Sequence, residues 1–228
     1  MIYWFMKNII IGPPVRAIFR PWSLGVANVP SSGPVIIASN HISFVDSVFI
    51  PLLMPRRMVF LAKSDYFRGR GLKGLLTRFF FVAIGMLPMD RSGGKASEAS
   101  LNTGLEVLNE GGVLGIYPEG TRSPDGNLYR GRTGVARMVL EAGVPVIPVA
   151  VVDTNKVMRV GSNRPHVHRV GVIYGKPLDF SRYAGLEGDR FILRSVTDEI
   201  TYEIARLGGQ QYVDVYASSV RQKAAAVS

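Results

Sequence analysis

Short apolar runs alternate with helix-like segments along most of this chain, and this alternation constrains its fold more than any other feature. Strand-like runs at 34–38, 58–62 and 113–117 are separated by segments in which apolar residues recur at helical spacing. Apolar runs of about four to eight residues, bounded by Gly and Pro, are typical of buried strands. The pattern predicts an α/β fold with a mostly parallel or mixed central sheet flanked by helices.

The remaining elements continue this alternation. We predict helices at 47–54, 73–81, 97–110, 134–141 and 189–207, and strands at 83–87, 144–152 and 169–174. The strand predicted at 144–152 contains Pro145 and Pro148. Prolines inside a strand favour an edge position or an irregular strand.

Composition limits the classes of partner and site. The chain has no Cys, which excludes disulfides, thiolate metal sites and cysteine nucleophiles. Its 27 Lys and Arg outnumber 17 Asp and Glu, and the resulting net charge of +10 predicts an anionic partner. Anionic lipid or a phosphorylated substrate is expected rather than nucleic acid, because the basic residues are scattered and form no recognised nucleic-acid motif.

The first 22 residues mix aromatic and aliphatic side chains with basic ones. They include Trp4, Phe5, Lys7, Ile9–Ile11, Arg16, Ile18, Arg20 and Trp22. This mixture predicts a helix that lies in the membrane interface, whereas the alternative is a helix packed on the core of its own domain. No apolar run reaches the roughly 18 residues of an ordinary membrane span, and no signal peptide is predicted.

His41 and Asp46 follow the first predicted strand. An imidazole paired with a carboxylate can take a proton from a hydroxyl near neutral pH. Five residues along a helix rotate by about 140°, so the two side chains can meet only if His41 lies at or before the helix start. Asn40 is a suitable N-cap for that helix. The spacing alone is common, and a capped helix with an exposed His and Asp is the alternative.

A second polar turn, at 117–123, also follows a predicted strand. Gly120 permits close approach of the backbone to a ligand, Thr121 can donate a hydroxyl, and Arg122 presents a fork that matches phosphate. Glu119 could orient Arg122 or bind an acceptor hydroxyl. A plain turn with an exposed salt bridge is the alternative.

Two further segments complete the set. Residues 85–91 are predicted to be the end of a strand, with Arg91 as the last residue of the segment. Residues 144–149 are apolar and could line a pocket or form core. These four segments, in this order, resemble the four blocks of the glycerolipid acyltransferases, specifically the 1-acyl-glycerol-3-phosphate acyltransferases. The first and third match almost residue by residue, whereas Pro88 and Met89 stand where the family's second block has Phe and Ile.

The resemblance implies a site and a reaction. His41 would be the general base and Asp46 would hold it, while the acceptor phosphate site would comprise Arg91, Glu119, Gly120, Thr121 and Arg122. Lys63 and Arg130, with Arg132, are further candidates for substrate binding at the same sheet end, or are solvated surface charges. The reaction is transfer of a fatty acyl chain from acyl-CoA or acyl-carrier protein to a lysophospholipid, 1-acyl-glycerol-3-phosphate, giving phosphatidic acid for phospholipid synthesis.

The acceptor hydroxyl attacks the thioester itself in this reaction, so no cofactor is expected. Backbone N–H groups near His41 are candidates for stabilising the oxyanion. No metal site is predicted, because His166 and His168 have no nearby third ligand. Alternatives are another lysophospholipid or glycolipid acceptor, or a non-catalytic lipid-binding protein of the same fold.

The organisation that follows has three parts. Residues 1–30 are expected to form an amphipathic membrane-association segment, residues 31–215 the acyltransferase domain and residues 216–228 a C-terminal tail. Within this tail, the small-residue stretch at 222–228 is expected to be frayed. The expected location is the cytoplasmic face of the cell membrane, as a peripheral or monotopic protein on anionic lipid.

Overall fold

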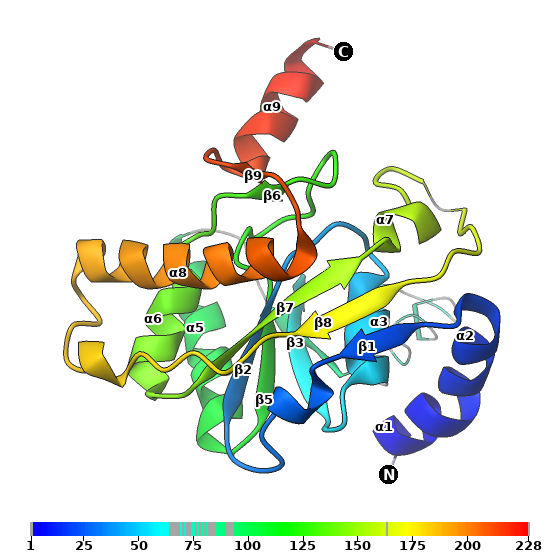
Figure 1. Ribbon diagram of the computed structural model, residues 1–228, viewed down its shortest axis with the longest axis horizontal. Coiled ribbons are helices and arrows are strands. Elements are labelled where there is room, and N and C mark those ends of the chain that lie inside the picture. Colours follow the sequence, from blue (N-terminus) through cyan, green and yellow to red (C-terminus); the bar gives the residue numbers. More distant parts are fainter. Residues whose placement is uncertain are drawn as a thin grey trace.

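A mixed seven-stranded sheet forms the centre of the computed structural model, which describes residues 2–63, 69, 71, 74–75, 77, 79, 81, 85–89, 94–162 and 164–227 (Figure 1). Its strand order is β1-β8-β7-β2-β5-β3-β4. The strands are β1 (Trp22–Leu24), β2 (Val35–Ser39), β3 (Met58–Lys63), β4 (Met86–Met89), β5 (Val113–Ile116), β7 (Val146–Val152) and β8 (Gly171–Tyr174). β8 pairs antiparallel with β7 and parallel with β1. Strands β1 and β8 therefore run opposite to the other five.

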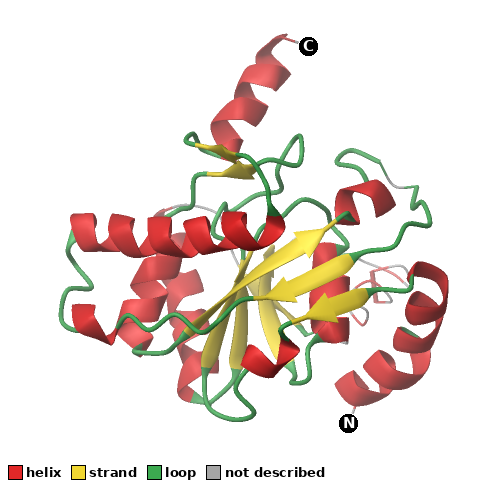
Figure 2. Ribbon diagram, in the orientation of Figure 1, coloured by secondary structure: helices red, strands yellow, loops and turns green. Residues whose placement is uncertain are grey.

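Helices cover both faces of the sheet, which confirms the predicted fold class (Figure 2). One face carries α5 (Gly94–Asn109), α6 (Gly134–Ala142) and α8 (Arg190–Gly208). The other carries α3 (Asp46–Leu53) and the N-terminal helical turns α1 (Ile2–Phe5), η1 (Met6–Ile10) and α2 (Gly12–Phe19). Shorter elements are η2 (Val26–Asn28), α7 (Thr154–Val157) and η4 (Ser181–Tyr183).

Strand β2 shows how the apolar runs build two cores. Val35 and Ile37 pack toward α3, whereas Ile36 and Ala38 pack toward α5, α6 and α8. All four side chains are fully buried. A strand covered on both faces must be apolar at every position, which is why this run lacks the alternation of a half-exposed strand.

The two proline-containing strands differ in position. Pro88 lies in β4, an edge strand, as expected for a residue without an N–H. Pro148 lies in β7, which is interior, so an edge position for that strand is wrong. The pairing register shifts by one residue opposite Pro148, because the segment that follows β8 has an extra residue there, and Gly175 donates its N–H to the Pro148 carbonyl (2.8 Å). Such a bulge tolerates a missing donor.

Both ends of the chain contain regular secondary structure. Residues 22–24, inside the predicted membrane segment, pair with β8 as part of the main sheet. The C-terminal tail predicted at 216–228 contains α9 (Ala217–Val227), which follows a small sheet made of β6 (Leu128–Tyr129) and β9 (Tyr212–Val213). Among the described residues, no helix combines the length and apolar character that crossing a membrane requires.

Some predicted elements fall on residues outside the described set. The helix predicted at 73–81 has only residues 74, 75, 77, 79 and 81 described, and the strand predicted at 83–87 is described from 85 onward, with β4 starting at Met86.

Candidate active site

Polar side chains gather where three neighbouring parallel strands end. β2 lies between β5 and β7, and the three run in one direction. His41 follows β2, Glu119 follows β5 and Thr154 follows β7. After β2 the chain continues on one side of that strand, through β3, β4 and β5, and then crosses to β7 on the other. The carboxyl edge of an α/β sheet at such a reversal is where ligands bind.

His41 and Asp46 form the pair that their spacing suggested. His41 Nδ1 lies 2.9 Å from Asp46 Oδ2, and α3 begins at Asp46, so His41 precedes the helix as required. The predicted N-cap is wrong, because Val45 occupies that position. Asn40 is buried, and its side chain pairs instead with the backbone of Val151. Its Oδ1 accepts the Val151 N–H (2.7 Å), and its Nδ2 donates to the Val151 carbonyl (3.1 Å). This contact fastens the His41 loop to β7.

Asp46 is fully buried and held by several donors. Its Oδ2 also accepts the N–H groups of Ile42 (2.9 Å) and Ser43 (2.8 Å), and its Oδ1 accepts the Thr154 hydroxyl (2.5 Å). A carboxylate so fixed favours the His41 tautomer with a proton on Nδ1, which leaves Nε2 as an acceptor. Thr154 was missed in the sequence, where its only signal is its place just after a predicted strand.

Three of the backbone N–H groups near His41, which are candidates for stabilising the oxyanion, are already engaged. Those of Ile42 and Ser43 donate to Asp46, and that of His41 donates to Glu119 Oε1 (3.1 Å). These three groups hold the loop in shape and do not point to an empty oxyanion site.

Tyr117 stacks against the His41 ring. The ring centroids are 3.8 Å apart and the planes differ by 9°, and Phe60 stacks on Tyr117 at 4.9 Å. The Tyr117 hydroxyl pairs with Ser47 Oγ at 2.8 Å, and burial raises the pKa of Tyr117 well above its ordinary value. The stack fixes one face of the imidazole, so Tyr117 is a positioning residue, a role that the sequence pattern did not predict.

Glu119 connects the two polar turns. Its Oε1 accepts from the His41 backbone, and its Oε2 accepts from the N–H of Tyr129 (3.0 Å). Ser123 adds a second connection by donating its N–H to the His41 carbonyl (2.6 Å). Because both Glu119 oxygens bind backbone within the fold and the residue is 1% exposed, its observed partners are neither Arg122 nor a surface ligand.

The pKa of Glu119 makes stability depend on pH. Burial raises this pKa from 4.5 to about 8, against the opposing effect of the Tyr129 and His41 N–H groups. Between these values the folded state keeps a proton that the unfolded state releases, so this contribution is complete below about pH 4.5 and is lost as pH rises through about 8. We expect the free energy of unfolding, measured in urea between pH 5 and 8, to fall more steeply with pH in wild type than in Glu119→Gln. Equal slopes would contradict this assignment.

The remaining predicted residues are placed as follows. Gly120 has φ +71°, and an added Cβ would lie 3.0 Å from Arg132 Cδ. The Thr121 hydroxyl accepts from Arg221 Nη1 (3.3 Å). In the described part of the chain, Arg122 forms no hydrogen bond or ion pair, whereas Arg130 Nε lies 3.6 Å from Asp214 Oδ1.

Three more predictions concern other segments. Lys63 is the last residue of β3, at the same carboxyl edge, and Arg91 lies outside the described residues. The apolar segment at 144–149 forms core. His168 Nε2 lies 3.2 Å from Asp153 Oδ2, and the described residues contain no cluster of three or more potential metal ligands.

His41, Asp46 and Glu119 lie inside a recognisable family segment. Residues 24–152, more than half of the chain, match the family model described as Acyltransferase. The chain belongs to the acyltransferase family. This finding confirms the resemblance inferred from the four sequence blocks.

Several acyltransferases are similar to this chain. The chloroplastic 1-acyl-sn-glycerol-3-phosphate acyltransferase of Arabidopsis thaliana is 31% identical over 160 residues, covering 69% of this chain and 43% of that protein. The 1-acyl-sn-glycerol-3-phosphate acyltransferase of Bacillus subtilis is 27% identical over 182 residues, covering 79% and 84% respectively. The chain thus spans less than half of the plant relative.

A solved structure shares the fold. The crystal structure of the 1-acyl-sn-glycerophosphate acyltransferase PlsC from Thermotoga maritima superposes with a TM-score of 0.64 at 20% identity, covering 90% of this chain and 86% of that one.

Proposed function

We propose that this acyltransferase moves a fatty acyl chain from acyl-CoA or acyl-carrier protein to the free hydroxyl of 1-acyl-glycerol-3-phosphate, forming phosphatidic acid. The observation that carries the proposal is His41 held by the buried Asp46 at the carboxyl edge of the sheet. The names of the relatives support the choice of acceptor.

The geometry supports a direct transfer. His41 Nε2 takes the proton of the acceptor hydroxyl while that oxygen bonds to the thioester carbonyl carbon. Asp46 stabilises the imidazolium that forms. The tetrahedral intermediate then expels the thiolate, which receives the proton from His41. No cofactor enters this scheme.

Arg122 is proposed to bind the acceptor phosphate. It follows β5 beside the Glu119 connection to His41, and within the described residues its guanidinium has no protein acceptor. A charge-assisted hydrogen bond contributes about 1.5 to 3 kcal/mol, so Arg122→Ala should raise the apparent KM for lysophosphatidic acid by about one to two powers of ten. Initial rates with the acceptor varied test this.

Two controls accompany that measurement. Arg122→Lys should restore the KM only in part, because lysine lacks the two-pronged geometry of arginine. Arg137→Gln removes the same charge from an exposed i,i+4 pair with Glu141 and should leave the KM unchanged. Unaltered acceptor kinetics in Arg122→Ala would favour a neutral acceptor such as a glycolipid.

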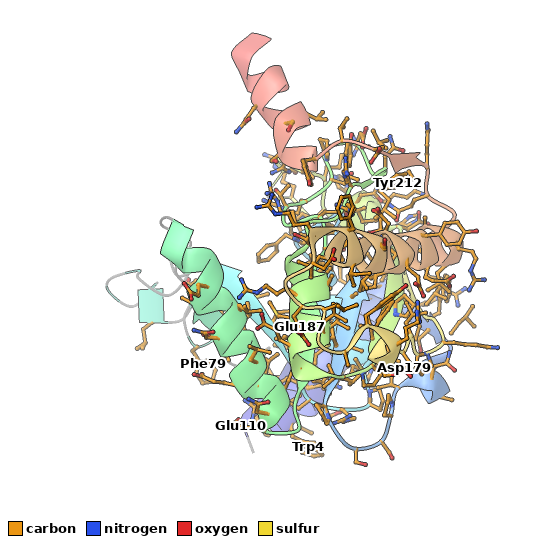
Figure 3. All side chains as sticks on the ribbon, turned by 90° about the vertical axis from the view of Figure 1, so that its left-hand side faces the viewer. Trp4, Phe79, Glu110, Asp179, Glu187 and Tyr212 are labelled. Atoms are coloured by element: carbon orange, nitrogen blue, oxygen red, sulfur yellow. The ribbon has the colours of Figure 1, made fainter. Side chains whose placement is uncertain are left out.

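The N-terminal helical segment is proposed to bind the membrane surface. One side packs on the core through Ile11, Val15 and Phe19. Other apolar side chains are exposed, among them Trp4, at the lower edge of Figure 3, which is 63% accessible, and Ile18, at 51%. The segment therefore contacts its own domain and still presents apolar surface.

Two of its basic residues donate to backbone carbonyls of the domain itself. Lys7 Nζ donates to the Met54 carbonyl and Arg16 Nη2 to the Leu52 carbonyl (3.3 Å), at the C-terminal end of α3. Cations at this end satisfy free carbonyls and favour the helix dipole. Burial, with the nearby Arg16, lowers the pKa of Lys7 to about 8. Membrane affinity should accordingly depend on apolar area more than on charge.

Exposed apolar side chains can be removed without disturbing the core contacts. We expect the double variant Trp4→Ser and Ile9→Ser to reduce cosedimentation with vesicles containing anionic lipid by tenfold or more, since each buried apolar side chain contributes about 1.5 to 3 kcal/mol. Phe191→Ser, on α8 and 84% exposed, is the matched control. Binding equal to that of the control would exclude this surface.

A further inference from the structure

Four arginines from three segments lie around the Glu119 turn. We define this arginine cluster as Arg122, Arg130, Arg132 and Arg221; Arg122 follows β5, Arg130 and Arg132 follow β6, and Arg221 lies on α9. The first turns of α9 lie beside the β6–β9 pair, and the rest of the helix projects away from the body in both Figure 1 and Figure 3.

Tyr216 and Ser218 hold the start of α9 against this turn. The guanidinium carbons of Arg130 and Arg132 lie 5.7 Å and 5.2 Å from the centroid of the Tyr216 ring. Arg132 Nη2 also donates to Ser218 Oγ (2.9 Å). These contacts fix α9 so that its next turn reaches the turn at 117–123, which contains Thr121 and Arg122.

Arg221 is the residue that reaches it. Its Nη1 donates to the Thr121 hydroxyl (3.3 Å), whereas its Nη2 is buried and has no hydrogen-bond partner among the described residues. Burial and the neighbouring charge of Arg122 lower the pKa of Arg221. In the described part of the chain, neither Arg122 nor Arg221 has a carboxylate partner, so two like charges lie together without a counter-ion. A buried donor without an acceptor is costly, and an anion would satisfy it.

We propose that Arg221 of α9 acts with Arg122 as a ligand for the phosphate of the acceptor. This inference depends on the proposed function. The two connections to the His41 backbone, from Glu119 and Ser123, flank Arg122 on both sides in the chain. In 1-acyl-glycerol-3-phosphate, the phosphate-bearing carbon is bonded to the carbon that carries the reacting hydroxyl. In acyl-CoA or acyl-carrier protein, the phosphates lie at the far end of the pantetheine arm, which favours the acceptor.

Initial rates of Arg221→Gln, with the two substrates varied separately, test the assignment. The acceptor KM should rise by about tenfold to a hundredfold, the range of one charge-assisted hydrogen bond, while the donor KM and kcat stay near wild type. Arg221→Lys should recover part of the loss. The matched control is Arg206→Gln, which removes an exposed arginine paired with Glu203 on α8. A merely structural role would not confine the effect to the acceptor KM.

Two kinetic outcomes would overturn the inference. A rise in the donor KM alone would assign the cluster to the donor phosphates, and kinetics equal to those of Arg206→Gln would exclude Arg221 as a ligand. Calorimetric titration with glycerol 3-phosphate does not depend on turnover, and Arg221→Gln should weaken that binding by a similar factor. If the wild-type protein bound glycerol 3-phosphate but transferred no acyl chain, the proposed function would be wrong and the phosphate site would still hold. If wild type and Arg221→Gln bound glycerol 3-phosphate equally, the inference about Arg221 would be wrong.

Discussion

Replacing His41 with alanine should lower the rate of acyl transfer by about a hundredfold to ten-thousandfold, the range that a positioned general base contributes. The ring has one nitrogen bonded to the buried Asp46 and one face covered by Tyr117, so its remaining nitrogen is the group placed to accept a proton. Formation of phosphatidic acid from radiolabelled acyl-CoA at saturating acceptor measures the loss.

The control for this variant is another histidine that is paired with an aspartate. His168 lies 3.2 Å from Asp153 and is 39% exposed, and it does not belong to the His41–Asp46 pair, so His168→Ala should retain full activity. Thermal unfolding should show that both variants remain folded. Near-wild-type turnover by a folded His41→Ala protein on every acceptor tested would refute general-base catalysis.

Asp46→Asn should cost about a thousandfold or more in turnover and should also destabilise the fold. Asp46 Oδ2 accepts from the His41 ring and from the N–H groups of Ile42 and Ser43. In one orientation of the asparagine, the amide N–H₂ faces the N–H groups of Ile42 and Ser43, or the His41 tautomer reverses. In the other orientation the amide oxygen keeps these bonds and the N–H₂ donates to the Thr154 hydroxyl, but the negative charge that stabilises the imidazolium is lost. Steady-state rates and urea unfolding of the same preparation would separate the two effects.

The matched control for Asp46→Asn is the same substitution at Asp153. Asp153 immediately precedes Thr154, and Asn tolerates its positive φ of 65°, so Asp153→Asn removes a nearby charge without disturbing the Asp46 bonds. Activity should stay within about twofold of wild type. Equal losses in the two variants would mean that general electrostatics, and not the hydrogen bonds of Asp46, determine the rate.

The sheet and the position of its site could be predicted from local sequence patterns. Apolar runs bounded by Gly and Pro located the strands, and polar turns directly after the runs at 34–38 and 113–117 located His41 and Glu119. Both turns lie at one edge because parallel strands end together. These inferences needed only neighbouring residues.

Contacts between distant segments could not be predicted in this way. Thr154 binds Asp46 across 108 positions, and the Asn40 contact with Val151 spans 111. Nothing in the local pattern distinguishes a threonine that meets a buried carboxylate from one in an ordinary turn. The small residues at 222–228 suggested a frayed tail, whereas the aromatic and cationic contacts of Tyr216 hold the first turn of α9.

Helix α3 connects the catalytic pair to the N-terminal segment that is proposed to bind the membrane. Asp46 is its first residue, and the carbonyls at its other end are held by Lys7 and Arg16 of the N-terminal segment. Eight residues of helix span about 12 Å. If the exposed side of that segment rests on a bilayer, the length of α3 sets the distance between the His41 imidazole and the membrane surface. The acceptor would then have to rise from the membrane by a fixed height, which makes the length of α3 a determinant of which lipids can reach His41.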